Sequence, residues 1–139
     1  MHVVRHKVLV VDDERIIADT LSQIFAADGY EARAAYDPGQ ATELISEWLP
    51  DLILVDIILP RMSGLDLAIF VKERFPICRV LLFSGQTATA NLLEDAEARG
   101  YTFEILPKPI HPREVLEAAR RILSDLPANQ SGCSAPSAE

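Results

Sequence analysis

Four short aliphatic runs, each ending at a polar or turn residue, constrain the fold of this chain more than any other feature. They cover residues 8–11, 52–55, 80–83 and the shorter 105–106. Continuous aliphatic runs, rather than alternating apolar and polar residues, are typical of strands that are covered on both faces, as in a parallel sheet. A fifth segment, residues 30–36, alternates more and carries Glu31 and Arg33, which predicts a half-exposed edge strand.

Helical patterns lie between these runs. Apolar residues recur with helical spacing within 17–25, 41–48, 65–71, 92–96 and, most clearly, 115–123. Strand and helix therefore alternate five times, which predicts an α/β fold with right-handed crossovers, a doubly wound five-stranded parallel sheet and helices on both faces. Five strands in about 125 residues match the flavodoxin-like order 2-1-3-4-5, although periodicity alone does not fix that order.

The composition limits what this chain can bind. Hydrophobic residues make up 49% of the sequence and aromatic residues only 6%, so the core must be aliphatic. The net charge of −8 disfavours broad electrostatic binding to DNA, RNA or anionic membranes. No run of about 18 uncharged apolar residues is present, and the apolar run near the N-terminus is too short for a signal peptide.

The organisation of the chain is that of one domain with a tail. We expect a folded domain over residues 1–126 and a flexible polar C-terminal tail over 127–139, which has no apolar stripe. The two cysteines, Cys78 and Cys133, are far apart and lack metal-binding spacing. As free thiols they indicate a reducing, cytoplasmic location.

Polar residues follow the predicted strands at their carboxyl ends, where ligands bind in sheets of this type. They are Asp12 and Asp13 after the first strand, Asp56 after the third, Ser84 after the fourth and Lys108 after the fifth. The first and third strands are neighbours in the assumed order, about 5 Å apart, so the three carboxylates are expected to face one another.

Such a cluster predicts a particular chemistry. Two carboxylates about 4 Å apart repel by roughly 4 kcal/mol at an effective dielectric constant of about 20. A hard divalent cation relieves this repulsion, and a few carboxylates with open coordination positions suit Mg²⁺. Asp56 is the best candidate nucleophile towards phosphorus, because it ends the middle strand and is followed by a loop, residues 57–64, that can move. A lone acid within an aliphatic run is also costly unless it has a partner or a ligand. Ser84 and Lys108 would then hold phosphoryl oxygens.

The sequence resembles the receiver domain of the two-component response regulators over about residues 7–124. The shared motifs are residues 10–14 with Asp12-Asp13-Glu14, residues 54–60 around Asp56 followed by Met62, Gly64 and Leu65, then Phe83-Ser84-Gly85, and Lys108-Pro109. The resemblance implies a phosphorylation-activated signalling switch of a two-component system or phosphorelay. Such a domain is not an ordinary enzyme, although it catalyses its own phosphorylation and dephosphorylation.

The resemblance also implies a role for each acid. Asp56 would accept a phosphoryl group, with Mg²⁺, from a sensor histidine kinase or a histidine phosphotransfer protein. Asp13 and Asp56 would bind the metal directly, and Asp12 would act mainly through water. The backbone carbonyl of Ile58 would complete the ligands that the protein supplies.

Beyond the acids, the resemblance gives Lys108 a role at the phosphoryl group and makes Ser84, Ile105 and Phe103 the candidate switch residues. Lys108 would pair with the phosphoryl group, before a Lys108–Pro109 bond that is cis in the family, and Ser84 would contact the phosphoryl group on switching. The family usually has Tyr or Phe three positions before the lysine, where this chain has Ile105. Either Phe103 takes that role, or the signal passes through the Ser84 loop and the fourth helix alone.

The expected output is protein binding. The resemblance implies a signalling face formed by the fourth helix, the fifth strand and the fifth helix, a downstream protein target, and a possible homodimer through those two helices. Direct contact with nucleic acid or membrane is not expected. One alternative is the N-terminal receiver piece of a longer transcriptional or enzymatic response regulator. A Mg²⁺-dependent aspartyl phosphatase is more distant, because dehalogenase-like phosphatases need a second Asp at the position of Ile58.

Overall fold

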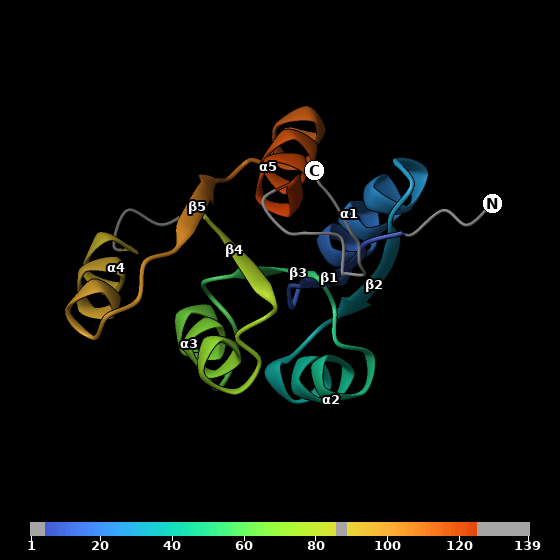
Figure 1. Ribbon diagram of the computed structural model, residues 1–139. Helices are drawn as coiled ribbons and strands as arrows, with labels where there is room; N and C mark the ends of the chain where they lie inside the picture. Colours follow the sequence, from blue (N-terminus) through green and yellow to red (C-terminus); the bar gives the residue numbers. More distant parts are fainter. Residues whose placement is uncertain (1–4, 86–88, 125–139) are drawn as a thin grey trace, which may run out of the picture.

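The computed structural model describes residues 5–85 and 89–124, in which helices pack on both faces of one sheet (Figure 1). Strands and helices alternate in the order β1 (Lys7–Val11), α1 (Arg15–Ala27), β2 (Glu31–Ala35), α2 (Pro38–Trp48), β3 (Leu52–Asp56), α3 (Gly64–Arg74), β4 (Arg79–Ser84), α4 (Thr89–Ala98), β5 (Glu104–Pro107) and α5 (Pro112–Ser124). The strand pairs are parallel and the order is β2-β1-β3-β4-β5, which confirms the predicted doubly wound fold. The predicted tail and Cys133 lie outside the described residues.

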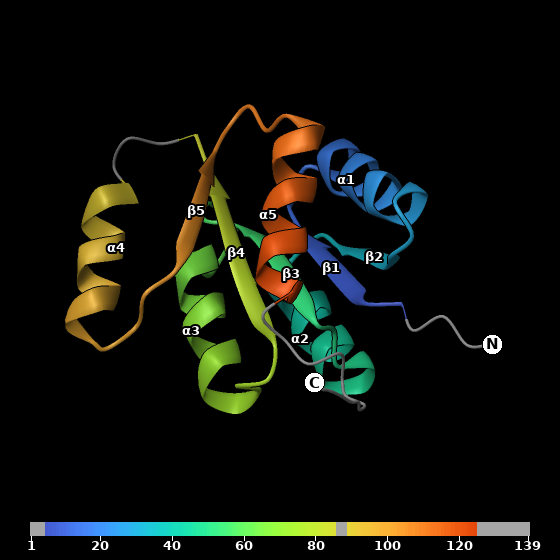
Figure 2. The same cartoon turned by 45° about the horizontal axis from the view of Figure 1, so that its top comes forward.

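Two apolar layers cover the sheet (Figure 2). Helices α1 and α5 cover the face of the sheet to which Val8 and Val10 belong, whereas α2, α3 and α4 cover the face of Leu9 and Val11. Every residue of β3 is buried, because this central strand has neighbours on both edges and helices on both faces. That environment explains its continuous aliphatic run. Within the described part of the chain, no helix is long and apolar enough to cross a membrane.

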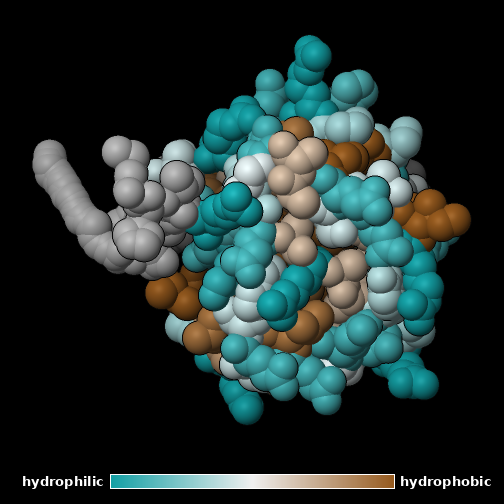
Figure 3. All heavy atoms as spheres, turned by 90° about the vertical axis from the view of Figure 1, so that its right-hand side faces the viewer, coloured by the Kyte–Doolittle hydropathy of each residue, from teal (hydrophilic) through white to brown (hydrophobic). Residues whose placement is uncertain are grey.

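The two edge strands differ from the central ones. In β2 the side chains of Glu31 and Arg33 are exposed, as predicted for an edge strand, and charges there discourage pairing with another chain. The side of the molecule near β2 is mainly hydrophilic, with hydrophobic residues in smaller separate areas (Figure 3). At the other edge, β5 has four residues, is only partly buried, and leads directly to Lys108.

Strand register brings the candidate site residues to one edge of the sheet. Val11 pairs with Val55, so Asp12 and Asp56 follow neighbouring positions on β1 and β3. Ser84 pairs with Pro107 at the ends of β4 and β5, and Lys108 comes next. Parallel strands end at the same edge, so residues that are far apart in the sequence meet there.

Candidate functional site

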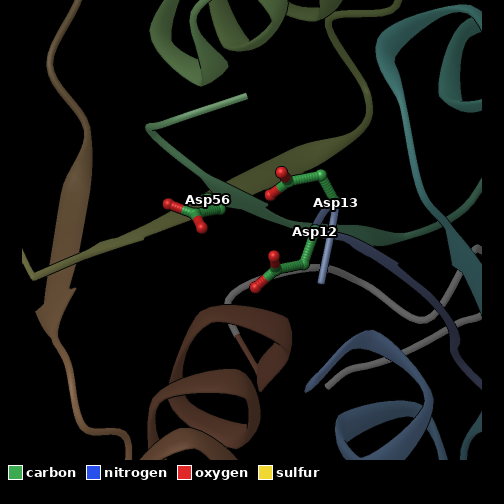
Figure 4. Close-up of side chains that lie close together, drawn as sticks. All are labelled: Asp12, Asp13 and Asp56. Atoms are coloured by element: carbon green, nitrogen blue, oxygen red, sulfur yellow. The ribbon is translucent and has the colours of Figure 1, made fainter. Parts of the chain in front are cut away.

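Three carboxylates meet at the carboxyl edge of the sheet, where Asp12 and Asp13 follow β1 and Asp56 ends β3. One oxygen atom of each lies within 4.8 Å of the others. Their side chains extend into the same space between the ends of the two strands (Figure 4). Asp12 has no exposed surface and Asp56 is 5% exposed, whereas Asp13 is exposed. Buried negative charges need compensation, which must come from a cation or from hydrogen bonds.

Lys108 supplies the positive charge among these acids. Its Nζ lies 2.8 Å from Asp56 Oδ2, 3.5 Å from Asp12 Oδ2 and 4.0 Å from Glu14 Oε1. Burial disfavours the charged ammonium, but the hydrogen bond and charge of Asp56, together with Asp12, outweigh this effect and raise the pKa of Lys108. One cation among several carboxylates leaves the pocket negative, so it retains an attraction for a second cation.

Backbone amides fix the direction of both buried carboxylates. The Ile58 N–H donates to Asp56 Oδ1 at 3.0 Å, and the Glu14 N–H donates to Asp12 Oδ1 at 2.9 Å. Both bonds run from a carboxylate to the amide two residues later, a local pattern typical of aspartate at the start of a turn. The second oxygen of each carboxylate therefore faces Lys108, and the orientation depends on residues adjacent in sequence.

A small opening reaches the acids from solvent. A cavity of about 310 Å³ is lined by Asp13, Glu14, Asp56, Ile58, Gly85 and Lys108. The sequence prediction assigned no role to Glu14 or Gly85. Both residues stand in the shared motifs, directly after Asp13 and Ser84, and that position is the sequence signal that marks them.

The remaining predicted residues fall in two places. Ser84 is buried at the end of β4, and its carbonyl accepts the backbone N–H of Lys108 at 2.9 Å, so it belongs to the same edge. The Lys108–Pro109 bond is cis, as the resemblance implied. Ile105 lies in β5 and Phe103 just before it; both pack against the core on the α3 side, and neither lines the acid cavity.

The donor set fits a hard divalent cation. All three acids offer carboxylate oxygens, which Mg²⁺ prefers, and the exposed side of Asp13 leaves room for water ligands. The environment of Asp12 changes its acidity. Burial and, to a smaller extent, the charge of Asp56 raise its pKa to about 6, although the Glu14 amide and Lys108 act in the opposite direction.

Magnesium affinity is expected to depend on the protonation of Asp12. A proton on this carboxylate removes one negative charge, so the affinity is constant well above pH 6 and falls as pH drops through 6, towards the weaker affinity of a site whose residue 12 is uncharged. The stability of the metal-free protein should change in the opposite sense. The native state binds this proton more tightly than the unfolded chain, so the Asp12 contribution is present at low pH and is lost as pH rises through 6.

Calorimetric titration with Mg²⁺ between pH 5 and pH 8 would measure this dependence. Asp12→Asn is the control: its affinity is expected to be weaker and nearly independent of pH over the same range. A parent protein whose magnesium affinity does not change across pH 6 would contradict the assignment to Asp12.

A doubly wound parallel sheet with three clustered carboxylates and a lysine at its carboxyl edge defines the class of small α/β domains in which this chain falls. The family model described as the response regulator receiver domain matches residues 8–120. The chain is 33% identical over 117 residues to the DNA-binding transcriptional regulator NtrC of Azospirillum brasilense, covering 84% of this chain and 24% of that protein. The chain therefore belongs to the response regulator receiver domain family, and it spans about a quarter of the length of that curated relative.

Solved structures agree with this family membership. A CheY-like receiver domain protein from Methanospirillum hungatei JF-1 is 28% identical, with a TM-score of 0.79 over 87% of this chain and 95% of that one. The receiver domain of NtrX from Brucella abortus is 32% identical, with a TM-score of 0.74 over 84% of this chain and 98% of that one.

Proposed function

We propose that this chain is a phosphorylation-controlled switch in which Asp56 accepts a phosphoryl group from a phosphohistidine. The observation that carries the proposal is the 2.8 Å contact between Lys108 Nζ and Asp56 Oδ2, inside a pocket that Asp12 and Asp13 keep negative. An ammonium group beside the acceptor can follow the negative charge onto the phosphoryl oxygens during transfer. The donor would be a sensor histidine kinase or a histidine phosphotransfer protein.

The transfer is a single displacement at phosphorus. A carboxylate oxygen of Asp56 forms a bond to phosphorus as the phosphorus–nitrogen bond to the donor imidazole breaks. The imidazole leaves with the electron pair and takes up a proton from solvent, and Asp56 becomes an acyl phosphate. Lys108 would pair with one phosphoryl oxygen and the Ser84 hydroxyl would hold another.

The proposed metal ligands are Asp12, Asp13, Asp56 and the backbone carbonyl of Ile58, with Asp12 acting mainly through water. When bound, Mg²⁺ neutralises the charge that accumulates between the acids and the phosphoryl oxygens. The side chain of Ile58 has no acid or base function, so the residue two positions after Asp56 cannot serve as the general acid of an aspartyl phosphatase. This favours a phosphoacceptor over a hydrolase.

A groove beside the pocket supports a protein as the phosphoryl donor. Its volume is about 300 Å³, and its apolar lining includes Ile16 and Ile17 of α1 together with Pro109 and Ile110. Ile16 is 82% exposed, which is unusual for an aliphatic side chain unless a partner covers it. The groove shares Lys108 with the acid cavity, so a protein seated there would bring its phosphohistidine towards Asp56.

The output of the switch is proposed to be protein binding through α4, β5 and α5. We propose that the chain can form a homodimer through α4 and α5. We also propose, as the alternative, that it is the N-terminal receiver of a longer transcriptional or enzymatic regulator, which the match to part of NtrC supports. We also propose a receiver domain over residues 1–126, followed by the polar tail over 127–139, and a cytoplasmic location for the protein. The free thiol of Cys78 supports the reducing compartment.

Labelling with a small phosphoryl donor tests the proposed function. Incubation with Mg²⁺ and acetyl phosphate, followed by intact mass measurement, is expected to show the addition of one phosphoryl group. Asp56→Asn should remain unlabelled, because an amide is a far weaker nucleophile than a carboxylate. Equal labelling of both proteins would exclude Asp56 as the acceptor, and no labelling of the parent would exclude the switch itself.

A further inference from the structure

Helix α4 is held by few buried side chains. Among its residues whose side chains are described, only Ala96 is buried, while Leu93 is half-buried and packs against the core on the α3 side. Both ribbon views place α4 at the margin of the molecule beside β5 (Figures 1 and 2). Elements with little buried apolar surface have low local stability, so a single hydrogen bond can determine the position of such a helix.

The C-terminal end of α4 is joined rigidly to Tyr101. Gly100 has a positive φ of 92°, its N–H donates to the Glu97 carbonyl at 3.0 Å, and the Tyr101 N–H donates to the Ala96 carbonyl at 2.9 Å. This pair of bonds is the Schellman motif, which ends a helix and fixes the residue after the glycine. Tyr101 therefore moves with α4.

The side chain of Tyr101 ties α4 to α3. Its hydroxyl donates to Glu73 Oε2 at 2.7 Å, and Glu73 lies near the end of α3. Its ring is stacked on that of Phe103, with ring centroids 6.4 Å apart and an angle of 9° between the ring planes. The hydroxyl contact is exposed, so it can break without leaving a buried polar group unpaired.

Two elements connect this contact with the acid pocket. Helix α3 starts at Gly64, whose N–H donates to the Ile57 carbonyl beside Asp56, and it runs to Glu73 at its other end. Strand β5 begins directly after Phe103 and leads to Lys108, which must shift its partner when Asp56 is modified. A change at the pocket therefore acts on both sides of the Tyr101–Glu73 contact.

We propose that the Tyr101–Glu73 hydrogen bond is a latch that holds α4 against α3 in the unphosphorylated protein and opens when Asp56 carries a phosphoryl group. The proposal rests on the proposed function. The aromatic residue that the resemblance placed three positions before Lys108 is Ile105 here, and the proposal gives its role to Tyr101, which is stacked on Phe103 and hydrogen-bonded to Glu73. By linkage, an interaction present only in the unphosphorylated state weakens phosphoryl binding by the same factor. Removal of the latch should therefore strengthen it.

The experiment measures the affinity for beryllofluoride, a mimic of the phosphoryl group, by calorimetry at saturating Mg²⁺. Tyr101→Phe keeps the ring stack and removes the hydroxyl, and its affinity is expected to rise about threefold to tenfold over that of the parent. Tyr36→Phe is the matched control, because the Tyr36 hydroxyl also donates to a carboxylate, Asp19 Oδ1 at 2.5 Å, but at the opposite edge of the sheet. Its affinity should equal that of the parent.

The affinity is the readout that a merely structural role would not move, and amide hydrogen exchange in α4 shows whether the helix itself is released. In the parent, beryllofluoride is expected to speed exchange in α4, and Tyr101→Phe should show that faster exchange without the mimic. A Tyr101→Phe protein with parental affinity would overturn the latch, even if exchange in α4 were faster, because faster exchange alone would mean a structural tie that is not coupled to the pocket. If the parent itself neither binds beryllofluoride nor is labelled by acetyl phosphate, the proposed function fails as well, whereas a labelled parent confines the failure to the latch.

Discussion

Replacing Gly64 by alanine is expected to destabilise the protein by about 3 kcal/mol and to slow phosphorylation of Asp56 by roughly 100-fold. A Cβ at this position would lie 1.9 Å from the Asp56 carbonyl oxygen and 2.8 Å from Ile57 Cα. Both neighbours are backbone atoms, so no side-chain rotation relieves the clash. The backbone that carries the phosphoacceptor has to move, and a displacement on the order of 1 Å is enough to disrupt a transfer geometry.

Urea denaturation and the rate of labelling by acetyl phosphate would measure both effects. Gly85→Ala is the matched control, because this glycine also borders the acid cavity and its Cβ would lie 3.5 Å from Lys108 Cβ, an ordinary contact. We expect its stability to stay within about 0.5 kcal/mol of the parent. If Gly64→Ala were as stable and as rapidly labelled as Gly85→Ala, α3 would not depend on this close approach.

The elements that the sequence predicted best are those whose environment is uniform along their length. The run 52–55 is aliphatic because all of β3 is buried, and the alternation around Glu31 arises because successive side chains of β2 lie on opposite faces of the sheet, one more exposed than the other. The weak periodicity within 92–96 also has a physical cause, since among the α4 side chains that the structure describes only Ala96 is buried. Local patterns record burial, and burial is what the fold class depends on.

The contacts that the sequence did not predict depend on tertiary geometry. The acid cluster could be predicted from the sequence because parallel strands end at one edge of the sheet, although Asp56 and Lys108 are 52 residues apart. No local pattern marks the approach of Glu14 to Lys108 or the bond between Tyr101 and Glu73, which join residues from separate elements. Exposed side chains at element ends have several rotamers, and neighbours distant in sequence select among them.

Asp13→Asn is expected to raise the stability of the metal-free protein and to abolish its response to magnesium. Asp13 is exposed, and two carboxylates near 4 Å repel by about 1 kcal/mol in a water-like dielectric, so its neutralisation should raise the melting temperature by about 3 °C. The same substitution removes a charged metal ligand and should weaken Mg²⁺ binding by roughly 100-fold or more. The increase in melting temperature that we expect for the parent with roughly 10 mM Mg²⁺ should then disappear.

Glu14→Gln separates metal ligation from general electrostatics. Glu14 lines the same cavity and carries the same charge as Asp13, but it is not one of the three acids whose oxygen atoms lie within 4.8 Å of one another. We expect Glu14→Gln to keep the magnesium-induced shift in melting temperature, because screening by water weakens charges that do not touch the ion. Equal loss of the shift in both variants would mean that the pocket attracts cations only through its net charge, and an unstabilised Asp13→Asn that still responds to Mg²⁺ would remove Asp13 from the proposed ligands.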